Sequence, residues 1–187
     1  MKSKISLYAI GFILIAAFSR LLPHPPNFTP VGAMALLGGS YLAKKYLKYL
    51  LPIAALFLSD LILNNTIMRV WYPDVEGFIF FTNSMLWVYS SFVIMILFGS
   101  IVLKNRSFKN LAFGTLGVSI LFFLITNFGV WFGSGIYPDN AGGLIACFGA
   151  ALPFFLNTIL GNIFYVLIGF GAMHLLEKRN NLSPVTA

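Results

Sequence analysis

The stretch FIFFTNSMLWVYSSFVIMILFGSIVL (78–103), followed at once by KNRSFKN (104–110), shows the pattern of the whole chain: a long apolar run that ends at a short basic segment. A helix needs about 20 mainly apolar residues to cross a bilayer, so this run is long enough to span one. Five further apolar stretches surround it, and together they predict an all-α integral membrane protein with six transmembrane helices in a single domain, residues 1–187. We expect the spans at about 5–22, 29–43, 49–65, 78–103, 108–132 and 153–176.

The basic residues alternate with these spans. Ten of the twelve Lys and Arg residues fall on one side of the predicted membrane: Lys2, Lys4, Lys44, Lys45, Lys48, Lys104, Arg106, Lys109, Lys178 and Arg179. Cytoplasmic loops of membrane proteins carry an excess of Lys and Arg. The pattern therefore predicts that both termini are cytoplasmic, with only Arg20 and Arg69 on the outer half.

The composition excludes several classes of protein. Hydrophobic residues make up 59% and charged residues 9% of the chain, and the mean hydropathy is +0.88, which leaves too little polar surface for a soluble protein. The net charge of +7 does not indicate nucleic-acid binding, because the basic residues lie beside helix ends, where they contact lipid headgroups and direct topology. No HExxH or GxSxG motif and no paired intramembrane Asp is present, so we do not expect an enzyme.

The three outer connections differ from the basic ones. They read LLPHPPNFTP (21–30), NNTIMRVWYPDVEG (64–77) and GSGIYPDNAGG (133–143), and are rich in Pro, aromatic and amide groups. Proline fixes φ and removes a backbone donor, so these segments are stiff enough to hold side chains in place for recognition. The alternative is that the prolines only turn the chain between helices.

Polar residues inside the spans fall mostly in the predicted outer leaflet. Asp60, Asn83, Asn127 and Asn157 all lie near the outer ends of their spans. Unsatisfied polar groups are costly in lipid, so these side chains should face the interior of the bundle and could line an outward-opening pocket. The alternative is that they only join helices by hydrogen bonds; for Asp60, that alternative is a pair with Arg20 or Arg69.

Residues 143–176 are too many for one span. Pro153 is expected to break this stretch, which leaves 143–152 as an interfacial or re-entrant piece and places Pro153 in the first turn of the sixth span. Cys147, the single cysteine, would then lie near the outer mouth as a candidate cobalt ligand or as a small apolar filler. A small-x-x-x-small pair, Ala35 and Gly39, should allow close helix packing by the second span.

Three segments carry a resemblance to a known family: RLLPHPPNFTPVGAMALLGGSYL (20–42), TNFGVWFGSGIYP (126–138) and GLIACFGAALPFFLNTILGN (143–162). They resemble small bacterial membrane proteins catalogued as candidate transport proteins, related to the substrate-binding S-components of energy-coupling-factor (ECF) vitamin transporters and distantly to solitary cobalamin transporters. The resemblance implies an S-component-like bundle in the bacterial cytoplasmic (inner) membrane with an externally facing pocket. It also implies an energising module as partner, although the first span lacks the Ala-x-x-x-Ala surface that many S-components use for docking.

These observations together predict an uptake protein for a small molecule of the vitamin or cofactor-precursor type, with no cofactor of its own. The aromatic and amide groups suit a flat, largely uncharged heterocycle. The alternatives are a solitary cobalamin or corrinoid transporter that uses Cys147, and a non-transporting membrane assembly subunit. The candidate ligand-binding residues are His24, Asn27, Phe28, Asp60, Trp71, Tyr72, Asn83, Asn127, Trp131, Tyr137 and Asn157.

Overall fold

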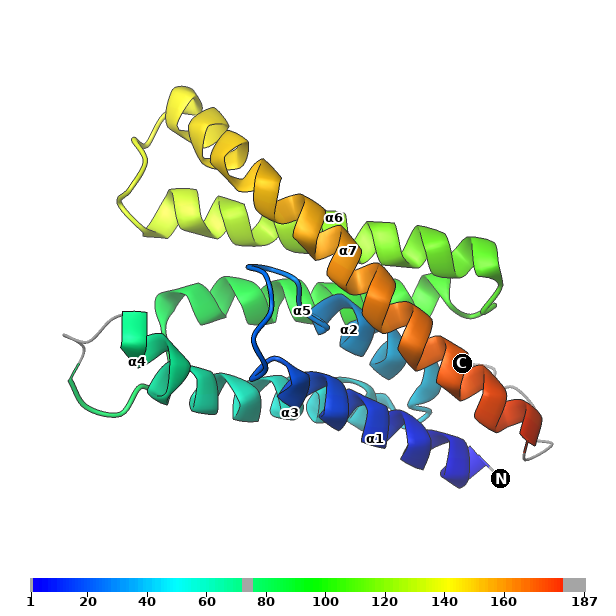
Figure 1. The fold of residues 1–187 in the computed structure, drawn as a ribbon. Helices are drawn as coiled ribbons and strands as arrows, with labels where there is room; N and C mark the ends of the chain where they lie inside the picture. Colours follow the sequence, from blue (N-terminus) through cyan, green and yellow to red (C-terminus); the bar gives the residue numbers. More distant parts are fainter. Residues whose placement is uncertain (1, 72–75, 180–187) are drawn as a thin grey trace.

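The computed structural model of the protein describes residues 2–71 and 76–179, and this part of the chain is all-helical. Four helices or helical stretches are long and apolar enough to cross a membrane, and two shorter apolar helices precede them. In chain order the helices are α1 (Lys2–Ser19), α2 (Val31–Tyr41), α3 (Lys45–Asn65), α4 (Ile67–Trp71), α5 (Asn83–Val102), α6 (Phe108–Gly133) and α7 (Ala141–Arg179) (Figure 1).

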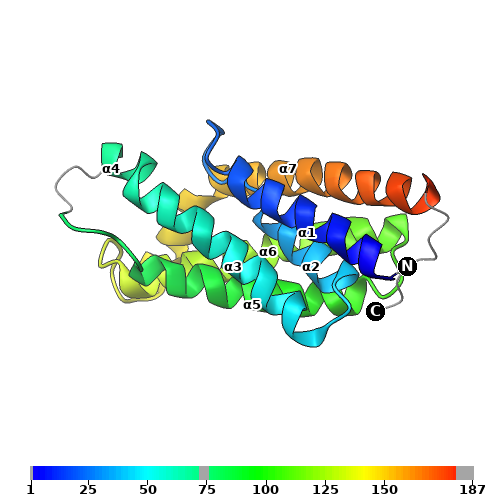
Figure 2. The same cartoon turned by 90° about the horizontal axis from the view of Figure 1, so that it is seen from below.

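The long helices lie side by side and alternate in direction, so the connections gather at two ends of the bundle (Figure 1). The short connections 42–44 and 103–107 lie at the same end as the start of α1 and the end of α7; we call this the basic end, because most Lys and Arg residues belong to it. Segments 66–71, 76–82 and 134–140 lie at the opposite end, which we call the loop end. The segment 20–30 stops short of the loop end and enters the bundle between its two ends (Figures 1 and 2).

Helix α2 forms the centre of the core. All of its residues are buried, and it packs against α1, α3, α5, α6 and α7 (Figure 2). A Cβ atom on Gly39 would lie 2.7 Å from the carbonyl oxygen of Ile96 and 2.9 Å from the backbone nitrogen of Ser100. Only glycine therefore lets α2 approach the backbone of α5 so closely, which confirms the close packing predicted for the second span.

The predicted break at Pro153 is wrong, because α7 is a continuous helix of 39 residues that contains Pro153 in its interior. Proline removes one helical hydrogen bond and costs about 3 kcal/mol in a helix interior. Packing on both sides of Pro153 offsets this cost: the rings of Phe148 and Phe155 lie 5.5 Å and 4.5 Å from the ring of Phe123 on α6. Residues 143–152 are thus the first turns of α7.

Three other boundaries differ from the predicted spans. The first two predicted spans form the short helices α1 and α2, because α1 ends at Ser19 and Pro30 precedes the first residue of α2. The span predicted from residue 78 begins at Asn83, after Thr82 in extended conformation at the N-cap. The short helix α4 follows Thr66 and was not predicted.

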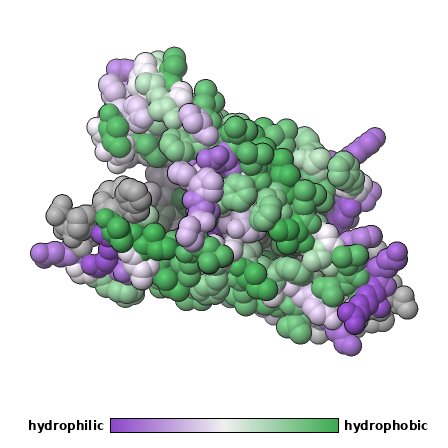
Figure 3. All heavy atoms as spheres, viewed as in Figure 1, coloured by the Kyte–Doolittle hydropathy of each residue, from purple (hydrophilic) through white to green (hydrophobic). Residues whose placement is uncertain are grey.

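The outside of the bundle is apolar. Of the apolar windows in the four longest helical stretches, only 22% to 33% is buried within the protein. Large hydrophobic side chains such as Leu152, Leu156 and Leu167 are more than half exposed on α7. Figure 3 shows hydrophobic residues over most of one face, with hydrophilic residues mainly at the two ends and along segment 20–30. Soluble proteins rarely expose apolar surfaces of this extent, and the helices are compatible with a membrane protein.

Candidate functional site

Segment 20–30 is held in place by α7. The Asn157 side-chain amide donates to the carbonyl oxygen of Pro26 at 2.9 Å. The ring of Phe28 packs on Phe164 and Tyr165, with ring centroids 5.7 Å and 6.2 Å apart. A Cβ atom on Gly161 would lie 3.0 Å from Phe28, so a larger residue there would push the segment away. The predicted site residues Phe28 and Asn157 therefore position this segment.

Asn27 is at the exposed turn of the segment. Its φ of 61° lies in the left-handed region, which asparagine tolerates better than most residues because its short side chain can hydrogen-bond locally. With Pro26 and Phe28 both fixed by α7, the position of Asn27 is determined on either side. Its side chain reaches a pocket between α5 and α6.

This pocket has a volume of about 420 Å³. It brings together three of the predicted ligand-binding residues, Asn27, Asn83 and Asn127, which come from segment 20–30, α5 and α6. The lining residues are Asn27, Asn83, Ser84, Trp87, Val88, Phe122, Thr126, Asn127, Gly129, Val130, Gly133 and Ser134. We call it the loop-end pocket. Figure 3 shows this end of the molecule hollowed beside segment 20–30.

Aromatic rings and amides form the walls of the loop-end pocket. Trp87 lies directly against Gly129, where a Cβ atom would overlap the indole, and its ring makes edge contacts with Phe128 and Phe132 at 5.6 Å and 6.1 Å. The Asn127 amide donates to the carbonyl oxygen of Phe123 at 2.7 Å. A primary amide carries a second N–H and an acceptor oxygen, so Asn127 keeps the capacity to bind a ligand.

Asp60 lies outside this pocket, in a buried ion-pair network. One carboxylate oxygen is 2.7 Å from Arg20 Nη1, and the other accepts a hydrogen bond of 2.6 Å from the Tyr89 hydroxyl. Arg20 also donates to the hydroxyl of Ser59 at 2.6 Å. Of the alternatives that the sequence left open for Asp60, the structure shows the pair with Arg20. The network joins α3 and α5 to the residue that follows α1.

The His24 ring is turned toward its own segment. Its Nδ1 lies 2.9 Å from the carbonyl oxygen of Pro25, and its Nε2 lies 3.2 Å from that of Arg20. The exposed ring thus spans the first half of segment 20–30 and does not line the loop-end pocket.

Three of the remaining predicted residues lie near the loop end: Trp131 in the last turn of α6, Tyr137 in the connection that follows, and Trp71 in α4. The indole of Trp131 donates to the carbonyl oxygen of Pro138 at 3.0 Å, which ties the end of α6 to the 134–140 connection; Tyr137 is half-buried in the same connection. Trp71 is the last residue of α4, and Tyr72 lies outside the described residues.

Cys147 is buried near the loop-end pocket without lining it. Its thiol lies 3.4 Å from the backbone carbonyl oxygen of Asn127. Among the described residues, no group of three or more His, Cys, Asp or Glu side chains is placed to hold a metal ion.

Sequence reasoning missed the aromatic walls of the pocket. Trp87 and Phe122 belong to continuous apolar runs, in which a pocket-lining ring cannot be told from a core or lipid-facing ring. The sequence feature that could have revealed the pocket is the pair Gly129 and Gly133. Two glycines four residues apart leave one face of α6 without side chains, and Trp87 fills the space at Gly129.

Comparison with protein families gives one match. Residues 2–185 match the model described as "Family of unknown function (DUF6580)". No curated protein and no solved structure gives a significant match.

Proposed function

Because the chain belongs to the DUF6580 family, whose function is unknown, we propose its function from its structure and sequence: it is a small-molecule uptake protein that binds its ligand in the loop-end pocket. The single observation that carries the proposal is the meeting of Asn27, Asn83 and Asn127 with the Trp87 ring in one cavity. Small-molecule sites combine apolar and aromatic walls with a few placed polar groups in the same way.

The proposal includes an S-component-like arrangement in the bacterial inner membrane. We propose that the protein crosses the membrane six times, with the basic end and both termini in the cytoplasm. The gathering of Lys and Arg at one end of the bundle supports this orientation, because cytoplasmic loops are enriched in these residues. The loop-end pocket would then face outward, as an uptake protein requires.

The size and walls of the pocket support a flat, largely uncharged heterocycle of the vitamin or cofactor-precursor type. A volume of about 420 Å³ is near the lower end of the range of about 300–1,000 Å³ for small-molecule sites. The ring of Trp87 offers a stacking face, and the three asparagines offer hydrogen bonds to polar edges. A corrinoid is less well supported, since Cys147 does not line this pocket.

An energising module that docks on α1 is also less well supported. The small residues Ala9, Ala16 and Ala17 of α1 are buried against the rest of the protein. They are therefore not presented outward to a partner in the way that a small-residue docking surface requires.

The test is native mass spectrometry of the detergent-purified protein with a panel of vitamins and precursors that includes corrinoids. We expect one compound to bind, and Asn127→Leu to weaken its binding about tenfold or more through loss of a ligand hydrogen bond. The matched control is Asn64→Leu, which makes the same change at a half-buried helical asparagine outside the pocket.

Two outcomes would contradict the proposal. Equal weakening by both variants would place the ligand elsewhere. A spectrum without bound ligand for every compound would instead favour a non-transporting membrane assembly subunit, whose partner would be sought by capture on the purified protein.

A further inference from the structure

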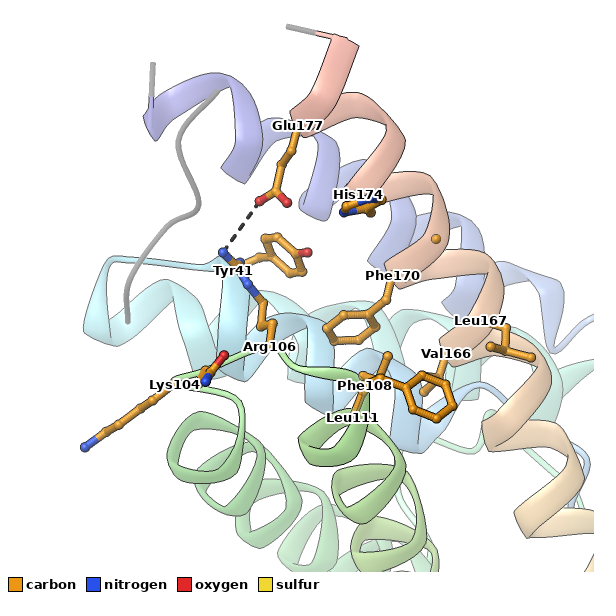
Figure 4. Close-up of a pocket in the computed structure, with 12 residues that line it drawn as sticks. Tyr41, Lys104, Arg106, Phe108, Leu111, Val166, Leu167, Phe170, His174 and Glu177 are labelled. Atoms are coloured by element: carbon orange, nitrogen blue, oxygen red, sulfur yellow. Dashed lines mark ion pairs between the residues drawn. The ribbon is translucent and has the colours of Figure 1, made fainter. Parts of the chain in front are cut away.

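A cavity larger than the loop-end pocket lies at the basic end, at the opposite end of the bundle. It has a volume of about 840 Å³ and lies between the end of α2, the 103–107 connection and the last turns of α7. Figure 4 shows Tyr41, Arg106, Phe170, His174 and Glu177 around it. The loop-end pocket and this cavity share no lining residue, so binding at this cavity does not depend on the proposed uptake function.

Arg106 and Glu177 form a loose ion pair at the polar end of this cavity. Their charged atoms are 3.6 Å apart, and the side chains are only 12% and 13% exposed. The Arg106 guanidinium also lies 4.2 Å above the centre of the Tyr41 ring, which holds it at the cavity (Figure 4). Both groups are thus largely withdrawn from water without being joined by a hydrogen bond.

Each member of the pair has a buried atom without a hydrogen-bond partner among the described residues. On Arg106 this atom is Nη1, and on Glu177 it is Oε1, the oxygen that lies 3.6 Å from Arg106 Nη2 in the ion pair. A buried charged group that lacks its hydrogen bond is costly, so both atoms would be stabilised by a ligand. The cavity therefore offers a donor suited to an anionic oxygen and, beside it, an acceptor suited to an N–H group.

The other end of the cavity is apolar and continues along the bundle. Phe108, Leu111, Val166 and Leu167 line it, and the same four residues also line a second cavity of about 320 Å³ between α6 and α7. The second cavity adds apolar residues such as Ile159 and Ile163, which lie further along α7 from the basic end. Because the two cavities share these four residues, we refer to them together as the groove, which is charged at the end of the bundle and apolar toward its middle.

From this geometry we propose that the groove is a binding site for a phosphatidylethanolamine-type lipid. The lipid phosphate accepts hydrogen bonds from Arg106, the lipid ammonium donates to Glu177, and an acyl chain lies between α6 and α7. A zwitterionic headgroup with N–H donors matches both atoms that lack a hydrogen bond, whereas a choline headgroup has no N–H donor for Glu177. Lipid is the occupant, and not a soluble zwitterion, because the groove continues as an apolar channel past the charged pair.

The test is native mass spectrometry of the full chain in detergent, titrated with phosphatidylethanolamine, phosphatidylcholine and phosphatidylglycerol of identical acyl chains. We expect phosphatidylethanolamine to bind at least about fivefold more tightly than phosphatidylcholine, the scale of one charged contact near a membrane surface. Equal affinities for these two lipids would overturn the proposal.

Variants of the charged pair test the headgroup. Glu177→Gln is expected to remove the preference for phosphatidylethanolamine and to improve binding of phosphatidylglycerol, because the carboxylate no longer repels an anionic headgroup. Since this variant leaves Arg106 without its partner, Arg106→Gln/Glu177→Gln serves as a second variant in which no charge is left unpaired. A double variant that folds and retains the preference would overturn the proposal.

A matched pair of substitutions tests the apolar groove. Leu167→Trp should fill it and weaken lipid binding, while Leu156→Trp makes the same change at a site on α7 that is equally exposed but lines neither cavity. Glycerophosphoethanolamine, the headgroup without acyl chains, should compete poorly. Strong competition by this soluble headgroup, together with no effect of Leu167→Trp, would overturn the proposal that a lipid occupies the groove and would favour a soluble phosphate-containing zwitterion.

Discussion

At the scale of single residues, Asp60 is a largely buried carboxylate whose charge is compensated by its neighbours. Its carboxylate contacts both Arg20 and Tyr89, and the paired side chains of Arg20 and Asp60 are 13% and 10% exposed. Removing one member of a buried pair leaves the other charge without compensation, at a cost of about 3–5 kcal/mol. We expect Asp60→Asn to lower the free energy of unfolding by an amount near this range, measured by denaturant titration in detergent.

The double variant Arg20→Met/Asp60→Leu is the control for this prediction. Apolar residues of similar volume often replace a buried pair without loss, because the desolvation of two charges is avoided. The double variant should therefore be more stable than Asp60→Asn. If it is equally unstable, the loss comes from disturbed packing and not from an unpaired charge.

At the scale of the elements, the contact between α2 and α5 depends on Gly39. An added Cβ atom would meet the α5 backbone at Ile96 and Ser100, which cannot rotate away as a side chain can. Gly39→Ala should force the helices apart and lower the free energy of unfolding by about 1–3 kcal/mol. Gly11→Ala on α1 is the matched control: no atom lies within 4 Å of its added Cβ, so it should stabilise the helix by about 0.5–1 kcal/mol. Equal effects at both positions would contradict the close approach.

The attachment of segment 20–30 to α7 gives a second prediction at this scale. Asn157→Ala removes the hydrogen bond to the carbonyl oxygen of Pro26. Backbone hydrogen exchange at Phe28 and Thr29 should then become faster, because the turn in which their backbone N–H groups donate hydrogen bonds is less firmly held. Thr158→Val is the control, since the Thr158 hydroxyl bonds only within α7, to Phe154. Unchanged exchange in Asn157→Ala would show that the aromatic contacts of Phe28 alone hold the segment.

At the scale of the whole molecule, the proposed orientation can be tested by labelling cysteines in intact cells. In a Cys147→Ala background, Asp139→Cys places an exposed thiol at the loop end, and Lys45→Cys places one at the basic end. We expect a membrane-impermeant maleimide to label only Asp139→Cys, and both after the membrane is permeabilised. Labelling of Lys45→Cys alone in intact cells would contradict the proposed topology and show that the basic end faces outward. The unsubstituted protein should resist labelling, because Cys147 is only 2% exposed.

The sequence alone determined the features that depend on neighbouring residues. Hydropathy summed over short windows identified the helical, membrane-compatible regions, and the positions of Lys and Arg distinguished one set of connections from the other. The same local information predicted the close packing of α2 through Gly39, and it offered an arginine partner for Asp60 only as the alternative to a place in the ligand pocket. It misplaced the boundary at Pro153, because contacts with Phe123, distant in sequence, decide whether that helix continues.

The tertiary structure alone decided which side chains meet. It selected Arg20 as the partner of Asp60, brought Asn27 to Asn83 and Asn127, and left Arg106 and Glu177 each with a buried atom that lacks a hydrogen bond beside the cavity at the basic end. The physical reason is that these contacts join residues far apart in the chain, so they depend on how whole helices pack. A window of sequence carries the preference of each residue for water or lipid, but only the packed bundle determines which polar groups find one another.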